Sequence, residues 1–298
     1  MERYGAVVQR IVAGGGVVML VGGLDSGKST LAKTIAGAGL LEGRTVGYVD
    51  SDLGQKTVGP PAAVTLRMLR TGLDLEPAAM SKPDALYFVG STSPQGQLLP
   101  LVVGTARLLT RAMDEGGADL VVVDTSGLVS GVYGQILKYH KVEMLQPDVV
   151  IGLQRGGELE PILGIIQRFF SCDTVALPVH PNIQPASVDE RAERREAAFR
   201  DYFGETPLQR WRIKPTVFMP ALPALFEQSQ LDGLLVGLSD GKGEYIGLGY
   251  LEYSTEDDVL RLLSPVAEAP KALKLGSVRV EEGFRTRRVD LRNLFGTD

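Results

Sequence analysis

The segment VGGLDSGKST, residues 21–30, contains several residues suited to holding a phosphate, and it overlaps the end of an apolar run. A connecting loop needs one glycine for a tight turn, whereas a loop whose amides surround an anion needs several, because side chains would block the approach. The segment satisfies the spacing G-x-x-x-x-G-K-[ST]. A glycine-rich turn with an exposed lysine is the alternative, and it leaves the helical spacing after the loop unexplained. The predicted nucleotide-binding residues are Gly22, Gly23, Asp25, Ser26, Gly27, Lys28, Ser29 and Thr30.

Each residue type in such a loop has a chemical task. We expect the amides of residues 25–29 to hold the β-phosphate of a nucleotide at the positive end of the following helix. Lys28 would reach the β- and γ-phosphate oxygens, and the Ser29 hydroxyl would bind Mg²⁺. The motif leaves the fate of the γ-phosphoryl group open, since proteins with this loop include switches, motors, ATPases and kinases.

Carboxylates follow two other apolar runs. Asp50 and Asp52 come after TVGYV, and Asp124 comes after LVVV. The carboxyl ends of strands in an open α/β sheet form the ligand-binding edge, where a carboxylate accepts a proton from an attacking hydroxyl or orients Mg²⁺. We therefore predict Asp50 as the base and a metal-binding residue, Asp124 as a metal-binding residue, and Asp52 in a supporting position near the substrate. Solvated strand ends are the alternative.

Short apolar runs alternate with helical segments over the first two-thirds of the chain. Continuous runs of valine, isoleucine and leucine separated by crossovers are typical of parallel strands buried on both faces. We predict a doubly wound, mostly parallel α/β domain over residues 1–205, which carries the phosphate loop and an arginine-rich helix. Short β-rich runs broken by turns predict a small β-rich C-terminal domain over residues 206–298. The predicted core strands are residues 17–21, 45–50, 85–90, 119–124, 148–153 and 174–179.

The composition restricts the class of protein. The chain has 298 residues, 44% of them hydrophobic, and a net charge of −5, so any polyanion must meet a local basic patch rather than an overall basic field. One cysteine and two histidines allow neither an internal disulfide nor a metal cluster of these residues, which favours a reduced, cytoplasmic setting. The apolar runs are too short to span a bilayer, and we expect no membrane association.

Several segments, in this order along the chain, resemble the polynucleotide 5′-hydroxyl kinase family. The resemblance covers most of residues 15–205, and two of its segments, DSDLGQ and DTSGLVSG, are far more specific than the phosphate loop. The chain is therefore similar to a family of kinases with a P-loop core. The segments are GGLDSGKST (22–30), DSDLGQ (50–55), GSTSPQG (90–96), DTSGLVSGVYGQILKYHKVEMLQPD (124–148) and RAERREAAFRDYF (191–203).

This resemblance implies transfer of the γ-phosphoryl group of ATP, or of GTP as an alternative donor, to the 5′-hydroxyl end of RNA or DNA with Mg²⁺. It implies Asp50 as the base and Lys28 as the lysine that holds the phosphates. Gln55 and residues 92–96 would form a clasp for the first phosphate of the substrate. The substrate-binding residues that we predict are Asp52, Gln55, Thr92, Ser93, Pro94, Gln95 and Gly96.

An arginine-rich helix is expected to close over the transferring group. Arg191 and Arg195 lie four residues apart, on one helical face, with Arg194 beside them. We predict that Arg191 and Arg195 are catalytic and stabilise charge on the phosphoryl group. A solvated helix with its arginines paired to neighbouring glutamates is the alternative. Leu128 stands where eukaryotic relatives carry tryptophan, which puts stacking on the terminal base in doubt.

An ATPase or GTPase switch that binds a protein partner is the rival function. In that case Asp50 and Asp124 would serve hydrolysis, and the arginine helix would grip the partner. The chain has no Asn/Thr-Lys-x-Asp motif for reading guanine, and residues 92–96 would have no clear task in a switch. We therefore favour the kinase, while the residues specify neither RNA over DNA nor any protein partner.

Overall fold

The computed structural model describes residues 2–204, 206–214, 217–224 and 226–296. Its core is a sheet with the strand order β4-β3-β2-β5-β1-β6-β7. The strands from β2 to β7 in this order are parallel neighbours, which confirms the predicted α/β fold with a mostly parallel core. The bounds are β1 Gly16–Gly22, β2 Val46–Ser51, β3 Ala63–Leu69, β4 Ala85–Phe88, β5 Leu120–Thr125, β6 Val149–Gln154 and β7 Asp173–Pro178.

Alternate residues of the central strand β1 enter two apolar cores. Met19 and Val21 pack against α4, α5 and α6 on one face of the sheet, and Val18 and Leu20 pack against α1 and α2 on the other. Because both faces are covered, the strand is apolar throughout. No helix in the described part of the chain is both long and apolar enough to cross a membrane. The helix bounds are α1 Glu2–Gly14, α2 Lys28–Leu41, α3 Pro77–Met80, α4 Leu98–Asp114, α5 Gly131–Leu145 and α6 Glu160–Phe169.

One edge of the core sheet differs from the prediction. No strand is predicted over residues 63–69, yet β3 forms there and runs antiparallel to both β2 and β4. The connection explains the direction: residues 52–62 form a loop without a helix, and a parallel return would require a longer crossover. The six predicted strands all form within two residues of their expected bounds.

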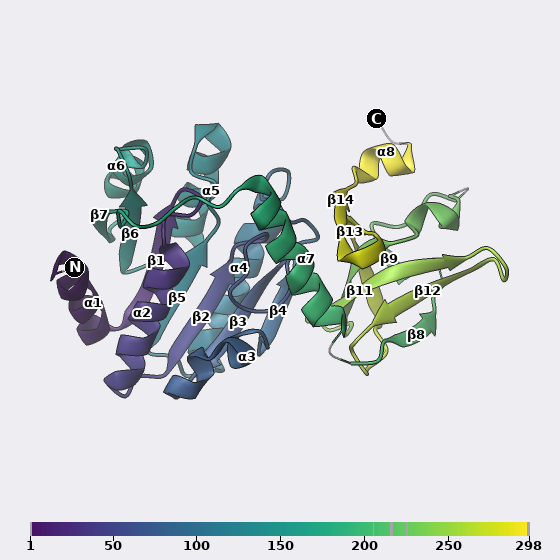
Figure 1. Ribbon diagram of the computed structural model, residues 1–298, viewed down its shortest axis with the longest axis horizontal. Helices are drawn as coiled ribbons and strands as arrows, with labels where there is room; N and C mark the ends of the chain where they lie inside the picture. Colours follow the sequence, from purple (N-terminus) through teal and green to yellow (C-terminus); the bar gives the residue numbers. More distant parts are fainter. Residues whose placement is uncertain (1, 205, 215–216, 225, 297–298) are drawn as a thin grey trace.

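The C-terminal part of the chain is rich in β-strands, as predicted, and most of its described strand pairs are antiparallel. Tyr245 of β11 pairs with Leu86 of β4, so one sheet continues from the core into this part (Figure 1). The division into separate domains at residue 205 stays a prediction. The bounds are β8 Gln209–Arg212, β9 Phe218–Met219, β10 Leu234–Ser239, β11 Tyr245–Ser254, β12 Val259–Ser264, β13 Ala272–Val280, β14 Thr286–Arg288 and α8 Leu291–Phe295.

Helix α7, Val188–Gly204, lies between the core and the C-terminal strands (Figure 1). In its second half, Phe199 and Phe203 are buried in a cluster that also contains residues of β4, β10, β11 and β13. The Tyr202 hydroxyl accepts a hydrogen bond from the Leu248 amide at 2.8 Å. The C-terminal half of the arginine-rich helix is therefore anchored, and its first half projects toward the phosphate loop.

Candidate active site

The phosphate loop joins β1 to α2 in a conformation that depends on glycine. Gly27 has a φ of +87° directly before Lys28, the first residue of α2. A side chain at Gly22 would meet the Ser26 hydroxyl at 2.5 Å. The resulting turn gathers backbone amides at a helix N-terminus, which is the arrangement that binds phosphate in proteins.

The Lys28 side chain is nearly buried, with 7% of its surface exposed. Its ammonium donates to the Gly23 carbonyl at 2.7 Å and lies 3.4 Å from the Ser26 hydroxyl oxygen. Burial lowers its pKa from the ordinary value, and nearby carboxylates, Asp124 first among them, act in the opposite direction. The ammonium therefore folds back over its own loop.

Asp124 has the donor atoms that suit a magnesium ion. Its Oδ2 accepts a hydrogen bond from the Tyr48 hydroxyl at 3.2 Å, whereas its Oδ1 is buried without a partner in the described chain. Burial, followed by the charge of Asp50, raises its pKa to about 6, and Lys28 and the Ser29 hydroxyl act in the opposite direction. An orphaned carboxylate oxygen beside a hydroxyl fits Mg²⁺. Among the described residues, no group of three or more His, Cys, Asp or Glu side chains could hold a metal ion, so phosphate and water oxygens would complete the shell.

Asp50 lies beside Asp124 in the register of β2 and β5, but its surroundings are different. The side chain is fully buried, and its oxygens accept bonds from three amides of the loop 52–58 at 2.6–3.0 Å. The Lys56 ammonium forms an ion pair with its Oδ1 at 3.0 Å. This saturated environment argues against the base and metal-binding roles predicted for Asp50, because its oxygens are already occupied by loop donors. Its observed contacts hold the loop after β2.

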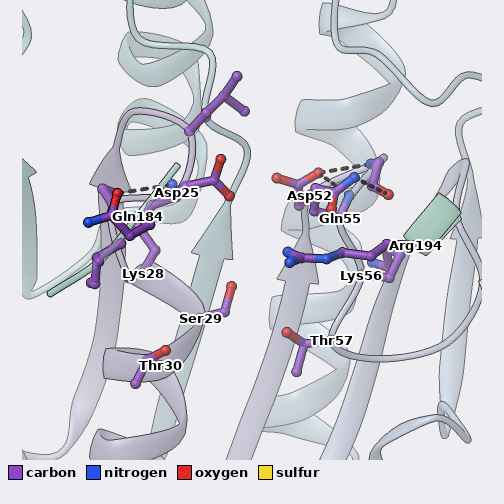
Figure 2. A pocket seen from close by; sticks show the side chains of 16 residues that line it. Asp25, Lys28, Ser29, Thr30, Asp52, Gln55, Lys56, Thr57, Gln184 and Arg194 are labelled. Carbon is purple, nitrogen blue, oxygen red and sulfur yellow. Dashed lines mark hydrogen bonds between the residues drawn. The ribbon is translucent and has the colours of Figure 1, made fainter. Parts of the chain in front are cut away.

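A cavity of about 410 Å³ separates the phosphate loop from the loop after β2. Figure 2 shows Lys28 and Ser29 on one side of it and Asp52 on the other. Asp52 Oδ1 accepts bonds from the amides of Gly54 and Gln55 at 2.8 and 3.0 Å. Its Oδ2 makes no hydrogen bond within the described chain and faces the gap (Figure 2). Asp52, expected only in a supporting position, is therefore the carboxylate of this loop that faces the phosphate side.

The arginines of α7 occupy three different positions around this cavity. Arg191 forms an ion pair with Asp25 of the phosphate loop at 3.1 Å. Arg194, which was not among the predicted catalytic residues, lines the cavity, and Figure 2 shows its side chain extending into it. Arg195 packs beside the loop after β2, with a buried Nε that has no partner in the described chain. The helix thus brings cationic groups to the site, with Arg191 already engaged by the phosphate loop.

The predicted clasp, residues 92–96, flanks the cavity rather than lining it. The Thr92 carbonyl approaches Gly54 so closely that a side chain at Gly54 would meet it at 3.0 Å. Gln55 does line the cavity, and its Nε2 donates to the Arg191 carbonyl at 3.0 Å. Gln55 therefore contacts α7, and Thr92 lies against the loop after β2.

Two buried lysines beneath the site were not predicted. Lys138 of α5 donates to the Thr125 hydroxyl and the Ser126 carbonyl, both at 2.8 Å. Lys141 donates to the Ser51 hydroxyl, and burial lowers the pKa of Lys141 to about 7. Both lie on the buried face of α5. The sequence could have indicated both lysines, because each stands on the apolar, core-facing side of the helix, where a charged side chain is buried only if it has a partner.

A second cavity, of about 610 Å³, lies on the other side of the phosphate loop. It shares Gly27 and Thr30 with the first cavity, and its walls include Val8 of α1, Leu31 of α2 and His180. The lining is mainly apolar, as is usual for a site that takes a planar base. The phosphate loop thus contributes residues to both cavities, of which the second has the more apolar lining.

The fold and the loop define a P-loop nucleotide-binding protein of the α/β class. The family described as mRNA cleavage and polyadenylation factor CLP1 P-loop matches residues 22–205. The chain is 32% identical to a polyribonucleotide 5′-hydroxyl-kinase of Methanocaldococcus jannaschii, covering 89% of this chain and 87% of the relative. It is 29% identical to one of Pyrococcus abyssi, covering 89% and 88%.

A solved structure agrees with this relationship at the level of the fold. The complex of wild-type Clp1p with a Pcf11p fragment contains a chain that superimposes with a TM-score of 0.72. The match covers 94% of this chain and 79% of that chain at 14% identity. With the family match over more than half of its length, the protein belongs to the Clp1 and polyribonucleotide 5′-hydroxyl-kinase family.

Proposed function

We propose that this protein is a kinase that transfers the γ-phosphoryl group of ATP to the 5′-hydroxyl end of RNA, with Mg²⁺. One observation carries the proposal: a single cavity is lined by the phosphate loop, by Asp52, whose Oδ2 accepts no hydrogen bond within the described chain, and by Arg194 of α7. The names of the archaeal relatives, polyribonucleotide 5′-hydroxyl-kinases, favour RNA over DNA as the acceptor.

The base in this proposal is Asp52 rather than Asp50. Oδ2 of Asp52 takes the proton of the 5′-hydroxyl. The hydroxyl oxygen then forms a bond to the γ-phosphorus, while the bond between that phosphorus and the β–γ bridging oxygen breaks and ADP leaves. Asp50 stabilises the loop that carries Asp52, because its carboxylate accepts the Asp52 amide at 3.0 Å.

Cationic groups supply most of the remaining catalysis, since phosphoryl transfer depends on positioning and countercharge. Lys28 leaves the Gly23 carbonyl and binds β- and γ-phosphate oxygens. Arg194 and Arg195 stabilise the charge on the transferring group from the lid side. When bound at Ser29 and Asp124, Mg²⁺ would neutralise phosphate charge.

The proposal is tested by transfer of labelled γ-phosphate from ATP or GTP to RNA and DNA oligonucleotides with 5′-hydroxyl ends. Oligonucleotides with 5′-phosphate ends serve as the substrate control. We expect label on 5′-hydroxyl RNA, and a loss of about 10²- to 10⁴-fold in kcat for Asp52→Asn with ATP binding retained. Label released only as free phosphate would favour the nucleotide switch. Unchanged transfer by Asp52→Asn would remove Asp52 from the role of base.

A further inference from the structure

The C-terminal strands attach directly to the segment that leads into the clasp. Strand β14 pairs with β13, and the Ser277 amide of β13 donates to the Gly90 carbonyl at 2.6 Å. The Ser277 hydroxyl donates to the same carbonyl at 3.1 Å. A side chain at Gly90 would meet the Gly276 backbone at 2.9 Å. Because of these contacts, β13 and β14 have a defined position relative to residues 92–96.

Arg288 of β14 reaches the clasp itself. Its Nη2 lies 3.9 Å from the position that a Cβ atom at Gly96 would occupy. Arg288 is exposed; its backbone belongs to the β13–β14 ladder, and its side chain makes no hydrogen bond or ion pair within the described chain. Hydrogen bonds from Arg292, and to a smaller extent the charge of Arg288, lower the pKa of Asp290. The Asp290 carboxylate forms its ion pair with Arg292, at 3.2 Å. The guanidinium of Arg288 is therefore available to an external anion.

The neighbouring arginine provides a contrast on the same strand. Side chains of consecutive strand residues point to opposite faces, and Arg287 forms an ion pair with Glu281 at 3.0 Å. Its charge is thus already matched within the protein. Of the two adjacent arginines, only Arg288 combines an unpaired guanidinium with proximity to the clasp.

A series of close approaches leads from the proposed base to Arg288. The amide of Gly54 binds Asp52 at 2.8 Å, and the Thr92 carbonyl lies against Gly54. The clasp then continues to Gly96, where Arg288 is found. A strand with its 5′ end at Asp52 and its first phosphate at the clasp would lead its next phosphate toward this guanidinium.

We infer that Arg288 binds the second phosphate of the nucleic-acid substrate, counted from the 5′ end. The inference rests on the proposed function and adds the C-terminal part of the chain to the substrate site. Arginine suits the task because its planar guanidinium binds phosphate through paired hydrogen bonds. A phosphate contact of this kind is independent of sequence and sensitive to salt, and it provides a local cationic group on a chain of net charge −5.

Two small substrates isolate the second phosphate. Both have a 5′-hydroxyl and two ribonucleosides joined by one phosphate, and only one of them carries a further 3′-phosphate. For the wild type we expect a KM about three- to tenfold lower with the 3′-phosphate than without it. Arg288→Ala should bring this ratio close to one, and Arg287→Ala should preserve it. With longer RNA, Arg288→Ala should reduce the slope of log KM against log salt by about 0.7.

The outcomes separate this inference from the proposed function. Equal KM values for the two substrates in the wild type, or a ratio that survives in Arg288→Ala, would overturn the role of Arg288 while leaving the kinase in place. An equal loss of the ratio in Arg287→Ala would also overturn it, because general charge would then explain the preference. Absence of label on both substrates with the wild type would instead count against the kinase itself.

Discussion

Asp50 and Asp124 lie one residue before the ends of neighbouring parallel strands, at the same register position, and both are buried. The Asp50 carboxylate accepts three amides and an ammonium. The Asp124 carboxylate accepts one hydroxyl and keeps a buried oxygen without a partner in the described chain. A buried polar atom that lacks a partner is costly unless a ligand completes it. Two aspartates at the same position on neighbouring strands thus differ in hydrogen-bond saturation, and on this ground we propose Asp124 rather than Asp50 as a metal ligand.

The strongest test of this comparison is Asp50→Asn. Removing one partner of a buried ion pair leaves the other charge uncompensated, here that of Lys56, and typically costs about 3–5 kcal/mol. We expect a loss of this size in the free energy of unfolding, measured by urea denaturation. Asp173→Asn is the control, because its ion pair with Arg10 is largely exposed and should contribute less than about 1 kcal/mol.

The same variant also tests the assignment of the base. In the fraction of Asp50→Asn that remains folded, we expect kcat to fall by less than about tenfold, well short of the loss for Asp52→Asn. If kcat fell as far as it does in Asp52→Asn, with the loop still folded, the base role would return to Asp50.

Asp124→Asn should have its main effect on the reaction. Loss of the charged oxygen weakens Mg²⁺ binding, and we expect a loss of about 10- to 100-fold in activity at limiting Mg²⁺. Excess Mg²⁺ should restore part of that activity, whereas Asp52→Asn should show no such rescue. Activity that does not depend on Mg²⁺ concentration in either protein would contradict a metal role for Asp124.

Without nucleotide or metal, Asp124→Asn should stabilise the protein at neutral pH. The Asp124 pKa is raised to about 6, so the protonated form is favoured in the folded state, and its stabilising contribution is lost as the pH rises through 6. We expect Asp124→Asn to gain about 2 kcal/mol at pH 8. The gain should shrink toward pH 4, as followed by thermal unfolding in chelator. A gain that stays constant across this pH range would show that the added stability does not arise from the ionisation of Asp124.

Much of this site could be predicted from local sequence. The phosphate loop and the ends of the strands follow from glycine spacing and from apolar runs that stop at a polar residue, as at Asp124. The choice between Asp50 and Asp52 as the proposed base could not be made in this way. It depends on the folded path of the loop after β2, which brings Lys56 and three backbone amides onto the Asp50 carboxylate. The strand β3 and the buried contacts of Lys138 likewise depend on tertiary packing, which single-strand patterns do not contain.

The smallest expected effect concerns the hydrogen bond that the Tyr48 hydroxyl donates to Asp124. Tyr48→Phe removes the hydroxyl that donates to Asp124 Oδ2, which should cost about 1 kcal/mol in unfolding free energy at pH 8. Because that bond favours the ionised carboxylate, its loss should move the pH midpoint for Mg²⁺-dependent activity upward. Tyr87→Phe is the control, since the Tyr87 hydroxyl makes no hydrogen bond within the described chain while its ring packs against Tyr245. An unchanged midpoint in Tyr48→Phe would mean that the Tyr48 bond does not affect the ionisation of Asp124. The contrast between Asp50 and Asp124 would then rest on Asp124 Oδ1, which is buried without a partner in the described chain.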